Sequence, residues 1–199
     1  MKKLLVIQGH PRDASFCNAL VERYVKGARA SGAEVRELSL NTLELEPWLK
    51  YDWGKNHDSI PLSEHLRQAR ELIAWSEHVT FAYPTFWTTP PALVKLFIEA
   101  IVASGFAFKY HKPLWGGIPR WDKLLKGRTA TIISTMDAPP FYMNWYEGDP
   151  GGKMMKNVLR FTGIRLVGKH YFGSVVLSKP EKREVWLRKA RVIGTRDGR

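Results

Sequence analysis

The segment from Gly9 to Asn18 has the residue types that bind phosphate groups. It leads from an apolar run into a helical pattern, so its polar groups lie where the free backbone amides of a helix N-terminus can bind an anion. The other reading is that Asp13 or Ser15 only caps the helix, which requires no ligand. The candidate donors, through side chain or backbone amide, are His10, Ser15, Phe16, Cys17 and Asn18.

Two further segments also hold candidate ligand-binding residues. Adjacent aromatic side chains on a proline-braced loop offer flat surfaces and exposed amides to a planar heteroaromatic ligand, although such side chains also pack in cores or at subunit contacts. The other segment ends a strand with polar groups and then turns, and it carries little information by itself. The aromatic segment supplies Pro84, Thr85, Phe86, Trp87 and Thr88, and the strand-end segment supplies Ser134, Thr135, Met136 and Asp137.

Other kinds of catalytic chemistry find little support in the sequence. The six histidines have no paired-ligand spacing and no His-Glu-x-x-His motif exists, so no metal site is expected. No Gly-x-Ser-x-Gly segment is present to carry a hydrolase nucleophile. Cys17 is the only cysteine, which excludes an intrachain disulfide. At a helix start it could be a thiol with a lowered pKa, but the favoured role is a small residue beside a phosphate.

Strands and helices alternate along the chain and must position these segments. Short apolar or alternating runs predict strands, and apolar residues at helical spacing predict helices. Residues 41–60 and 104–127 are expected to be long connections. The expected strands are residues 4–7, 34–40, 78–83, 128–135 and 166–176, and the expected helices are residues 16–30, 62–73, 92–103, 153–162 and 180–193.

Two of these helices carry further expectations. Between Ala92 and Ala103 only Lys95 and Glu99 are polar, so this helix must be buried on more than one side. A partner subunit is the simplest cover for its second side. Residues 178–181, Ser-Lys-Pro-Glu, predict a capping box at the start of the last helix. Residues 194–199 are expected to form a frayed tail.

The alternation of elements predicts a single α/β domain over residues 1–199, with helices on both faces of a five-stranded parallel sheet. No internal repeat or interdomain linker is present. In such a sheet a ligand binds beyond the carboxyl ends of the strands, at the point where the strand order reverses. All three candidate segments follow strands, so they are expected to meet at that point.

The charge of the chain is uneven. The formal net charge is +12, and residues 151–199 hold 13 Lys or Arg but 3 Asp or Glu. A basic segment can attract nucleic acid, an anionic membrane or a phosphorylated small molecule, or it can be a solvated face. No nucleic-acid recognition motif accompanies it, so no nucleic-acid partner is expected. The first apolar run is too short for a signal peptide and no run could span a membrane, which predicts a cytoplasmic protein.

Together, the segments resemble the flavodoxin-like NAD(P)H:quinone oxidoreductase family. The resemblance implies a flavodoxin-like, doubly wound sheet with the strand order 2-1-3-4-5, and a bound flavin. The length favours FMN over FAD, because longer relatives carry an extra segment that covers the adenosine. The motifs that carry the resemblance, over about residues 3–140, are Gly9-His10-Pro11, Ser15–Asn18, Pro84-x-x-Trp87, Pro91–Lys95 and Gly105–Tyr110.

The resemblance also implies roles for the three segments. In the family, the segment that corresponds to residues 10–18 contacts the cofactor phosphate. The segment that corresponds to residues 84–88 contacts the isoalloxazine ring, and the one that corresponds to residues 134–137 contacts an edge of the flavin. This chain departs from the family at Phe86, at Thr88 and over residues 134–137, where Gln, an aromatic residue and Thr-Thr-Gly-Gly are usual. Tyr142 is the candidate counterpart of a tyrosine that helps hydride transfer in some relatives. No histidine matches the partner of that tyrosine.

The reaction that the resemblance implies is a ping-pong transfer of two electrons. NAD(P)H reduces the flavin and leaves, and a quinone-like, azo or nitroaromatic acceptor then takes the electrons. A homodimer is expected. Two other functions remain open: a flavin-binding regulatory subunit docked on a membrane transporter, and a flavodoxin-type electron carrier, although such carriers are typically acidic. Consumption of NADPH by the purified protein would separate the enzyme from both.

Overall fold

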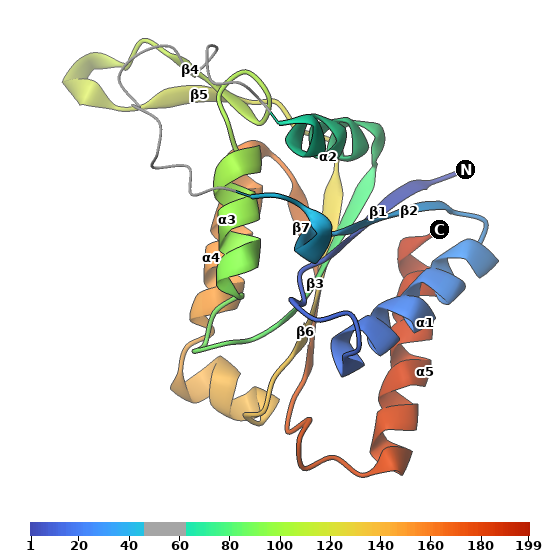
Figure 1. Cartoon of the computed structure of the whole chain (residues 1–199). Coiled ribbons are helices and arrows are strands. Elements are labelled where there is room, and N and C mark those ends of the chain that lie inside the picture. The colour runs from blue at the N-terminus through green and yellow to red at the C-terminus, as the bar shows by residue number, and fades with distance from the viewer. Residues whose placement is uncertain (46–62) are drawn as a thin grey trace.

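The central sheet has five parallel strands in the order β2-β1-β3-β6-β7 (Figure 1). The structure is a computed structural model that describes residues 1–45 and 63–199. Because β4 and β5 lie outside this sheet, the order is the expected 2-1-3-4-5 arrangement. The strands are β1 Lys3–Gln8, β2 Glu34–Ser39, β3 His78–Pro84, β6 Thr129–Thr135 and β7 Arg165–Phe172.

Helices cover both faces of this sheet, as the alternation of elements predicted. One face carries α1 and α5, and the other carries α2, α3 and α4 (Figure 1). The flavodoxin-like, doubly wound α/β fold is therefore confirmed. The helices are α1 Phe16–Ala30, α2 Glu64–Trp75, α3 Ala92–Ile101, α4 Pro150–Thr162 and α5 Pro180–Asp197.

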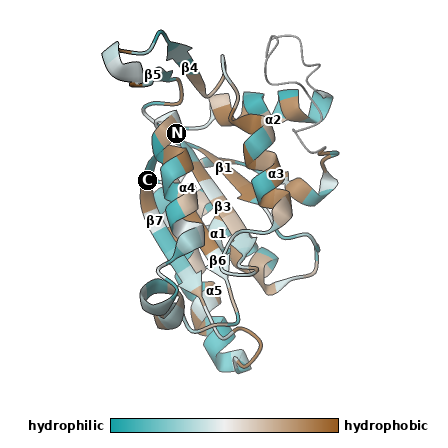
Figure 2. Cartoon of the chain, turned by 90° about the vertical axis from the view of Figure 1, so that its left-hand side faces the viewer, coloured by the Kyte–Doolittle hydropathy of each residue, from teal (hydrophilic) through white to brown (hydrophobic). Residues whose placement is uncertain are grey.

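Residues of each strand alternate between two cores. In β1, Leu5 and Ile7 face the core beneath α2, α3 and α4, whereas Leu4 and Val6 face the core beneath α1 and α5. Because both faces are covered, a central strand such as β1 is a continuous apolar run rather than an alternating one. Figure 2 shows β1 in brown between the helices, with teal residues on their outer surfaces.

The long connection expected over residues 104–127 contains structure of its own. It forms an antiparallel hairpin of β4, Phe108–His111, and β5, Arg120–Lys123, which projects past the end of α3 (Figure 1). The hairpin is held at its base by Phe161 of α4, on which the Trp121 ring stacks at 4.8 Å between centroids. Of the connection expected over residues 41–60, residues 46–60 lie outside the described residues.

The predicted capping box at the start of α5 is wrong. The N-cap residue is Lys179, and no side chain caps the helix. Ser178 instead donates its hydroxyl to the Val175 carbonyl oxygen at 2.6 Å and accepts from Arg183 Nε at 2.8 Å. Pro180 has no amide hydrogen to satisfy, so the first turn needs one cap fewer.

The expected frayed tail over residues 194–199 is also wrong, because α5 continues to Asp197. Gly194 is buried where α5 crosses α1, and a Cβ at this position would lie 1.9 Å from the Tyr24 carbonyl oxygen. This glycine therefore permits a close helix crossing and does not end the helix. The buried Asp197 carboxylate, which accepts from the Tyr24 hydroxyl at 3.1 Å, holds the last turn against the sheet.

Helix α3 is buried mainly within the chain itself. Its only strongly polar side chains, Lys95 and Glu99, form an exposed ion pair. The side chains of Val94, Phe97 and Ile98 are buried beneath them. A partner subunit is therefore not needed to explain the apolar character of this helix.

Candidate functional site

The three candidate segments meet at the carboxyl ends of the central strands, in the lower half of Figure 1. Gly9 follows β1, and its amide donates to the Ala82 carbonyl oxygen of β3 at 2.7 Å. Thr85 follows β3, and its amide donates to the Thr135 carbonyl oxygen of β6 at 2.7 Å. The Thr85 and Ser134 hydroxyl oxygens lie 2.8 Å apart. The second and third segments are thus hydrogen-bonded to each other, and the first is bonded to β3 just before the second begins, where the strand order reverses.

The first segment presents hydrogen-bond donors at the N-terminus of α1. Ser15 is the N-cap residue, and its hydroxyl oxygen accepts from the Asn18 amide at 3.2 Å. The hydroxyl proton remains available to a ligand. The Phe16 and Cys17 amides precede the helix's own hydrogen-bond ladder and make no bond within the described part of the chain. Capping and anion binding are therefore compatible, because the cap uses the hydroxyl only as an acceptor.

His10 adds a further donor to this segment. Its Nδ1 accepts from the Arg12 amide at 3.0 Å, so the proton of the neutral ring lies on Nε2. Burial lowers the pKa of His10, which keeps the ring neutral at pH 7. Arg12 was not a sequence candidate, although it is the only Lys or Arg between Gly9 and Asn18. Its side chain is exposed, and its positive charge also lowers the pKa of His10.

Cys17 is not the reactive thiol that its position allowed. Its side chain is 1% exposed, and burial raises its pKa to about 12. The thiol is therefore protonated at neutral pH, and a protonated thiol is a poor nucleophile. What Cys17 offers to a ligand is its backbone amide.

The second segment forms a tight turn that exposes an aromatic side chain. Phe86 and Thr89 exchange two backbone hydrogen bonds, from the Phe86 amide at 2.8 Å and from the Thr89 amide at 3.1 Å. Between them Trp87 and Thr88 have φ of 49° and 66°, the pattern of a type I′ turn without glycine. The Trp87 side chain is 97% exposed, and Phe86 is partly exposed beside it. Pro84 is the last, buried residue of β3.

The third segment is more buried than its predicted role suggested. Ser134, Thr135 and Met136 are buried, so their side chains do not form an open surface, and the Ser134 hydroxyl is bonded to Thr85. The Asp137 carboxylate accepts from the Val176 amide at 3.3 Å. Only backbone groups and the partly satisfied Asp137 carboxylate are thus available to a ligand at this edge.

Tyr142 begins a short π-helix, Tyr142–Tyr146, that follows the third segment. Its ring stacks on Tyr146 at 4.9 Å between centroids. A hydrogen bond to the Glu147 carboxylate raises the pKa of Tyr142, so its hydroxyl is protonated at neutral pH. Among the described histidines, only His10 belongs to the three segments, which leaves Tyr142 without the imidazole that some relatives pair with it.

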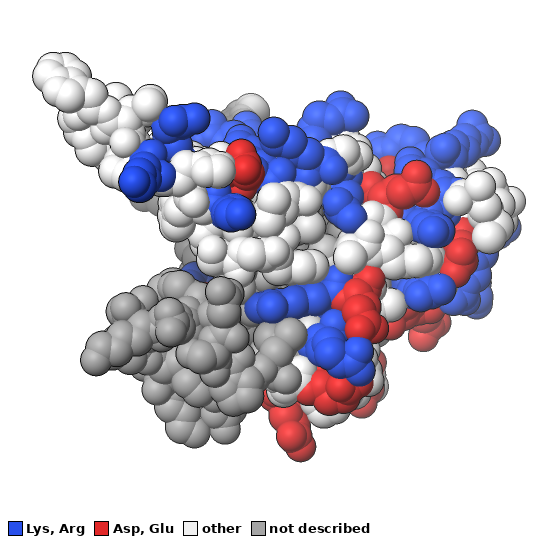
Figure 3. All heavy atoms as spheres, turned by 90° about the horizontal axis from the view of Figure 1, so that it is seen from above, with Lys and Arg blue, Asp and Glu red and all other residues white. Residues whose placement is uncertain are grey.

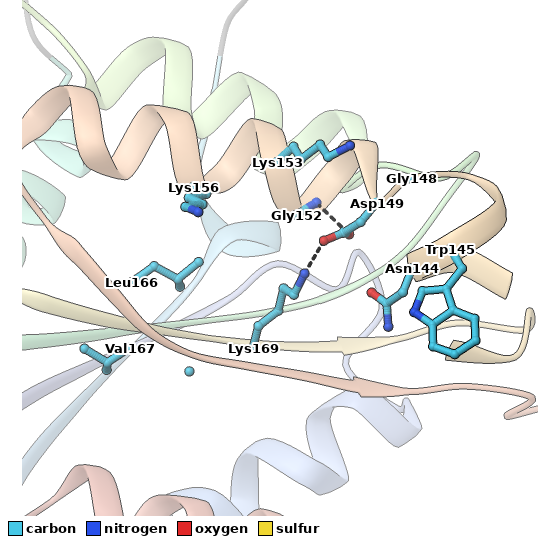
Figure 4. Close-up of a pocket in the computed structure, with 11 residues that line it drawn as sticks. Asn144, Trp145, Gly148, Asp149, Gly152, Lys153, Lys156, Leu166, Val167 and Lys169 are labelled. Atoms are coloured by element: carbon cyan, nitrogen blue, oxygen red, sulfur yellow. Dashed lines mark hydrogen bonds and ion pairs between the residues drawn. The ribbon is translucent and has the colours of Figure 1, made fainter. Parts of the chain in front are cut away.

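A charged cluster that the sequence did not reveal lies at the start of α4. Asp149 is its N-cap in the left-handed conformation, with φ of 56°, and accepts from the Gly152 amide at 3.2 Å. The same carboxylate accepts from the Tyr171 hydroxyl and pairs with Lys169, both on β7. Burial and the Asp149 carboxylate raise the pKa of Tyr171 well above its ordinary value. Figure 4 shows the Lys169 and Gly152 contacts of Asp149.

The cluster lines a cavity of about 630 Å³ between α4 and β7 (Figure 4). A sequence signal existed, namely Asp149-Pro150 followed by glycines at a helix start. Nothing in the sequence showed that β7 would supply the lysine of this cluster.

Within the described residues no group of three or more His, Cys, Asp or Glu could hold a metal ion. No helix in the described part is long and apolar enough to cross a membrane.

Several proteins of known sequence are similar to this chain. An FMN-dependent NADH:quinone oxidoreductase from Macrococcus caseolyticus is 24% identical over 182 residues, which cover 82% of this chain and 83% of that protein. An uncharacterized NAD(P)H oxidoreductase from Haemophilus influenzae is 26% identical over 106 residues. That alignment spans about half of each protein, 53% of this chain and 52% of the relative.

Solved structures of similar fold are also known. Smu.1420 from Streptococcus mutans superposes with a TM-score of 0.79 at 23% identity, over 98% of this chain and 99% of that one. An FMN-dependent NADH-azoreductase from Bacillus anthracis, solved in complex with FMN, superposes with a TM-score of 0.75 at 16% identity over 100% of both chains. At these identities the likeness establishes the fold alone.

The sequence also matches a whole protein family. The family is described as having a flavodoxin-like fold, and the match covers residues 2–192, which is nearly the whole chain. The strand order of the sheet and the three segments at its carboxyl edge agree with that match. The chain therefore belongs to the flavodoxin-like fold family known as Flavodoxin_2.

Proposed function

We propose that this protein is an FMN-dependent NAD(P)H oxidoreductase that passes two electrons to quinone-like, azo or nitroaromatic acceptors. Sequence relatives support the class of reaction, since one is named an FMN-dependent NADH:quinone oxidoreductase and another an NAD(P)H oxidoreductase. A structural neighbour is named an azoreductase in complex with FMN. The bound flavin would supply the redox chemistry, by taking a hydride from the nicotinamide and then reducing the acceptor.

The residues at the start of α1 fit the phosphate end of FMN. The Phe16 and Cys17 amides, the Ser15 hydroxyl and His10 Nε2 can all donate, and the helix N-terminus favours an anion. Asn18 Oδ1 is buried and has no partner among the described residues, while the Asn18 side-chain nitrogen donates to the Asp13 carbonyl oxygen at 2.6 Å. A ribityl hydroxyl of FMN would satisfy this unpaired oxygen.

The turn at residues 86–89 fits the flat end of FMN. The exposed Trp87 and the partly exposed Phe86 supply an apolar wall against which a planar ring system can lie. Nicotinamide and acceptor would use the open side of that ring in turn, which a ping-pong reaction requires. Backbone amides of this turn would stabilise negative charge on the reduced ring, as an oxyanion hole stabilises a tetrahedral intermediate.

Tyr142 is the side chain proposed to assist hydride transfer. It lies just beyond the third segment, and the pKa that Glu147 raises keeps its hydroxyl protonated at neutral pH. A protonated hydroxyl can donate a hydrogen bond to a developing negative charge. No acid–base pair is needed besides, because the cofactor carries the chemistry.

We further propose that the protein is a homodimer. The argument rests on exposed apolar side chains of the β4–β5 hairpin and not on helix α3, which is buried mainly within the chain. Several large apolar side chains are exposed at the tip of the β4–β5 hairpin: Leu114 at 49%, Trp115 at 98% and Ile118 at 57%. Clusters of exposed apolar residues in a soluble domain mark contact surfaces. A second copy of the chain is the proposed cover.

One observation supports the main proposal: the free amides at the N-terminus of α1 and an exposed aromatic turn both lie where the strand order reverses. The test is a titration of purified protein with FMN, followed by flavin fluorescence, in the wild type and in Ser15→Asp and Ser15→Ala. Asp also caps helices, so Ser15→Asp keeps the helix start but places a negative charge against the phosphate. We expect it to weaken FMN binding far more than Ser15→Ala does.

Ser15→Ala is the matched control, because it loses the cap and about 1 kcal/mol of stability without adding charge. Equal FMN affinity in the wild type and Ser15→Asp would contradict the phosphate site. No flavin binding by the wild type would contradict the proposed function as a whole. Bound flavin that neither NADH nor NADPH bleaches would favour an electron carrier or a regulatory subunit.

A further inference from the structure

The cavity between α4 and β7 differs in chemistry from the three segments. Its upper wall in Figure 4 is the first turns of α4, its lower wall is β7, and the π-helix closes one end. The walls carry three lysines but one carboxylate: Lys153 and Lys156 come from α4, Lys169 comes from β7, and the carboxylate is that of Asp149.

The two helix lysines are available to an anion. They are three residues apart on α4, so they lie on the same helix face. Neither has an ion-pair partner among the described residues, whereas Asp149 is already paired with Lys169 and bonded to Tyr171 and Gly152. The single acid of the cavity is thus neutralised, and the positive charges of Lys153 and Lys156 remain uncompensated.

An irregularity of β7 gives the cavity its third lysine. The pairing of β6 with β7 shifts between Ala130 and Thr131, where Leu166 and Gly168 of β7 become the successive partners. Without such a bulge, Leu166 and Lys169 would face opposite sides of the sheet, because strand residues alternate. With it, Leu166 packs in the core beneath α4 and Lys169 also reaches α4, at Asp149.

The positive region extends along the groove past this cavity. A second hollow, of about 330 Å³, shares Lys156 and Leu166 with the first and is also lined by Lys123, Lys126, Arg160 and Arg165. Figure 3 shows Lys and Arg side chains gathered along one side of the molecule, with few acidic ones among them. A ligand with more than one phosphate is therefore favoured over an uncharged one.

Two features suit the cavity to a nucleotide that reaches the proposed flavin site. The Gly151 amide of α4 donates to the Thr88 carbonyl oxygen at 3.2 Å, so the turn that carries Trp87 adjoins the N-terminal end of the cavity. At the same end, Trp145 lines the cavity while 86% exposed, which leaves its ring free to stack on a base.

We propose that this cavity binds the adenosine 2′-phosphate end of NADPH, with Trp145 against the adenine and Lys153 and Lys156 on the 2′-phosphate. The inference rests on the proposed function and adds a preference for NADPH over NADH. A phosphate monoester carries a charge between about −1.5 and −2 at pH 7, and NADH lacks this group. Lys binds such a group as a point charge, so no bidentate geometry is required.

Binding of fragments tests the proposal without turnover. Calorimetric titration of the FMN-loaded protein should give an affinity for 2′,5′-ADP at least about tenfold above that for 5′-AMP, as expected for two charge-assisted contacts. Lys153→Glu/Lys156→Glu should remove this difference. Trp145→Ala should weaken both fragments, because both carry the adenine.

The matched control is Arg23→Glu/Lys26→Glu. These residues are exposed on α1, have the same three-residue spacing and change the net charge equally. The control should bind 2′,5′-ADP as the wild type does. Equal loss in the control would show that net charge alone attracts the fragment, and it would overturn the site. Failure of 2′,5′-ADP to bind the wild type better than 5′-AMP would also overturn it.

Flavin bleaching in stopped flow separates this proposal from the proposed function. The wild type should be reduced by NADPH with a kcat/KM at least about tenfold above that for NADH. Lys153→Glu/Lys156→Glu should lose this preference, because the substitutions should raise KM for NADPH far more than KM for NADH. Equal reduction of the wild type by both nucleotides would overturn the NADPH site and leave the oxidoreductase intact. Bleaching by neither would overturn the oxidoreductase itself.

Discussion

At the scale of single residues, the side chains near the proposed phosphate site are not suited to proton transfer, whereas Tyr142 can donate a hydrogen bond during the reaction. His10 and Cys17 have the residue types of catalytic groups, yet burial keeps the first neutral and raises the pKa of the second to about 12. Neither side chain is therefore suited to exchange protons with a substrate, and what they offer a cofactor is the His10 Nε2 proton and the Cys17 backbone amide. Tyr142 differs, because its hydroxyl is polarised by Glu147 and its ring is partly exposed.

Replacement of Tyr142 by Phe removes that hydroxyl and keeps the ring. We expect the rate of flavin bleaching by NADPH to fall about tenfold, the effect of losing about 1.4 kcal/mol of transition-state stabilisation. Reoxidation by a quinone should stay at the wild-type rate. Stopped-flow absorbance measures both half-reactions, and Tyr146→Phe, in the ring stacked on Tyr142, is the control. An equal effect of the two variants would assign the loss to packing of the rings.

At the scale of elements, the turn at residues 86–89 is strained where it displays Trp87. Thr88 is β-branched and has φ of 66°, a conformation that costs such residues about 1–3 kcal/mol. Strain of this kind persists only where neighbouring structure maintains it. Here the reciprocal bonds of Phe86 and Thr89 and the Gly151 amide on the Thr88 carbonyl oxygen do so.

Replacement of Thr88 by Gly should relieve this strain. We expect the free energy of unfolding to rise by about 1 kcal/mol, since the relief exceeds the entropic cost of a glycine. FMN affinity should fall, because a freer turn holds Trp87 less firmly. Urea denaturation and FMN titration measure the two effects. Thr89→Gly is the control, at a position without positive φ, and should destabilise. A loss of stability in both variants would mean that Thr88 is not strained.

Local sequence patterns predicted most elements and the first two segments, because these depend on neighbours in the chain. The helix over residues 16–30 and the Ser15 cap at its start are of this kind. The capping box failed because α5 begins after Lys179, and the Ser178 hydroxyl oxygen accepts from Arg183 Nε instead of from a helix amide. The β4–β5 hairpin was missed because its short strands are held by Phe161, a contact between distant residues.

The basic cavity could not be predicted for a similar reason. Lys153 and Lys169 are brought to one cavity by the crossover from α4 to β7 and by the bulge in the β6–β7 pairing. A one-residue change in register would turn Lys169 to the opposite face. The sequence shows an excess of Lys and Arg over Asp and Glu in residues 151–199. Only the register of β7 shows which of these lysines line the same cavity.

At the scale of the whole molecule, the exposed hairpin tip determines the expected assembly. Light scattering of the wild type at low protein concentration should give about twice the chain mass of 22.8 kDa. Leu114→Ser/Trp115→Ser should shift this mass to that of the monomer, because it removes most of the apolar surface of the tip. Circular dichroism should be unchanged, since neither side chain is buried. A wild-type monomer, or a dimer unaffected by the substitutions, would contradict this interface.

A buried polar network joins the end of α5 to α1 and β3. Asp197 of α5 accepts from the Tyr24 hydroxyl of α1 at 3.1 Å, and its Oδ2 lies 3.5 Å from His78 Nε2 of β3. Arg196 donates to its other oxygen at 2.7 Å. Burial opposes ionisation of Asp197, but the neighbouring His78 and Thr131 and the hydrogen-bonded Arg196 outweigh it and lower the pKa of the carboxyl group well below its ordinary value.

Because the folded-state pKa of Asp197 is lowered, its ionised form stabilises the fold at every pH above the unfolded pKa of about 3.9. This stabilisation is lost as the pH falls below that value. Asp197→Asn should therefore lower the free energy of unfolding by about 1–3 kcal/mol at pH 7, because it removes a charged acceptor from the buried Tyr24 hydroxyl and from Arg196. Below about pH 4 the difference from the wild type should shrink. Urea denaturation between pH 3 and 8 measures it, and a difference independent of pH would assign the effect to packing.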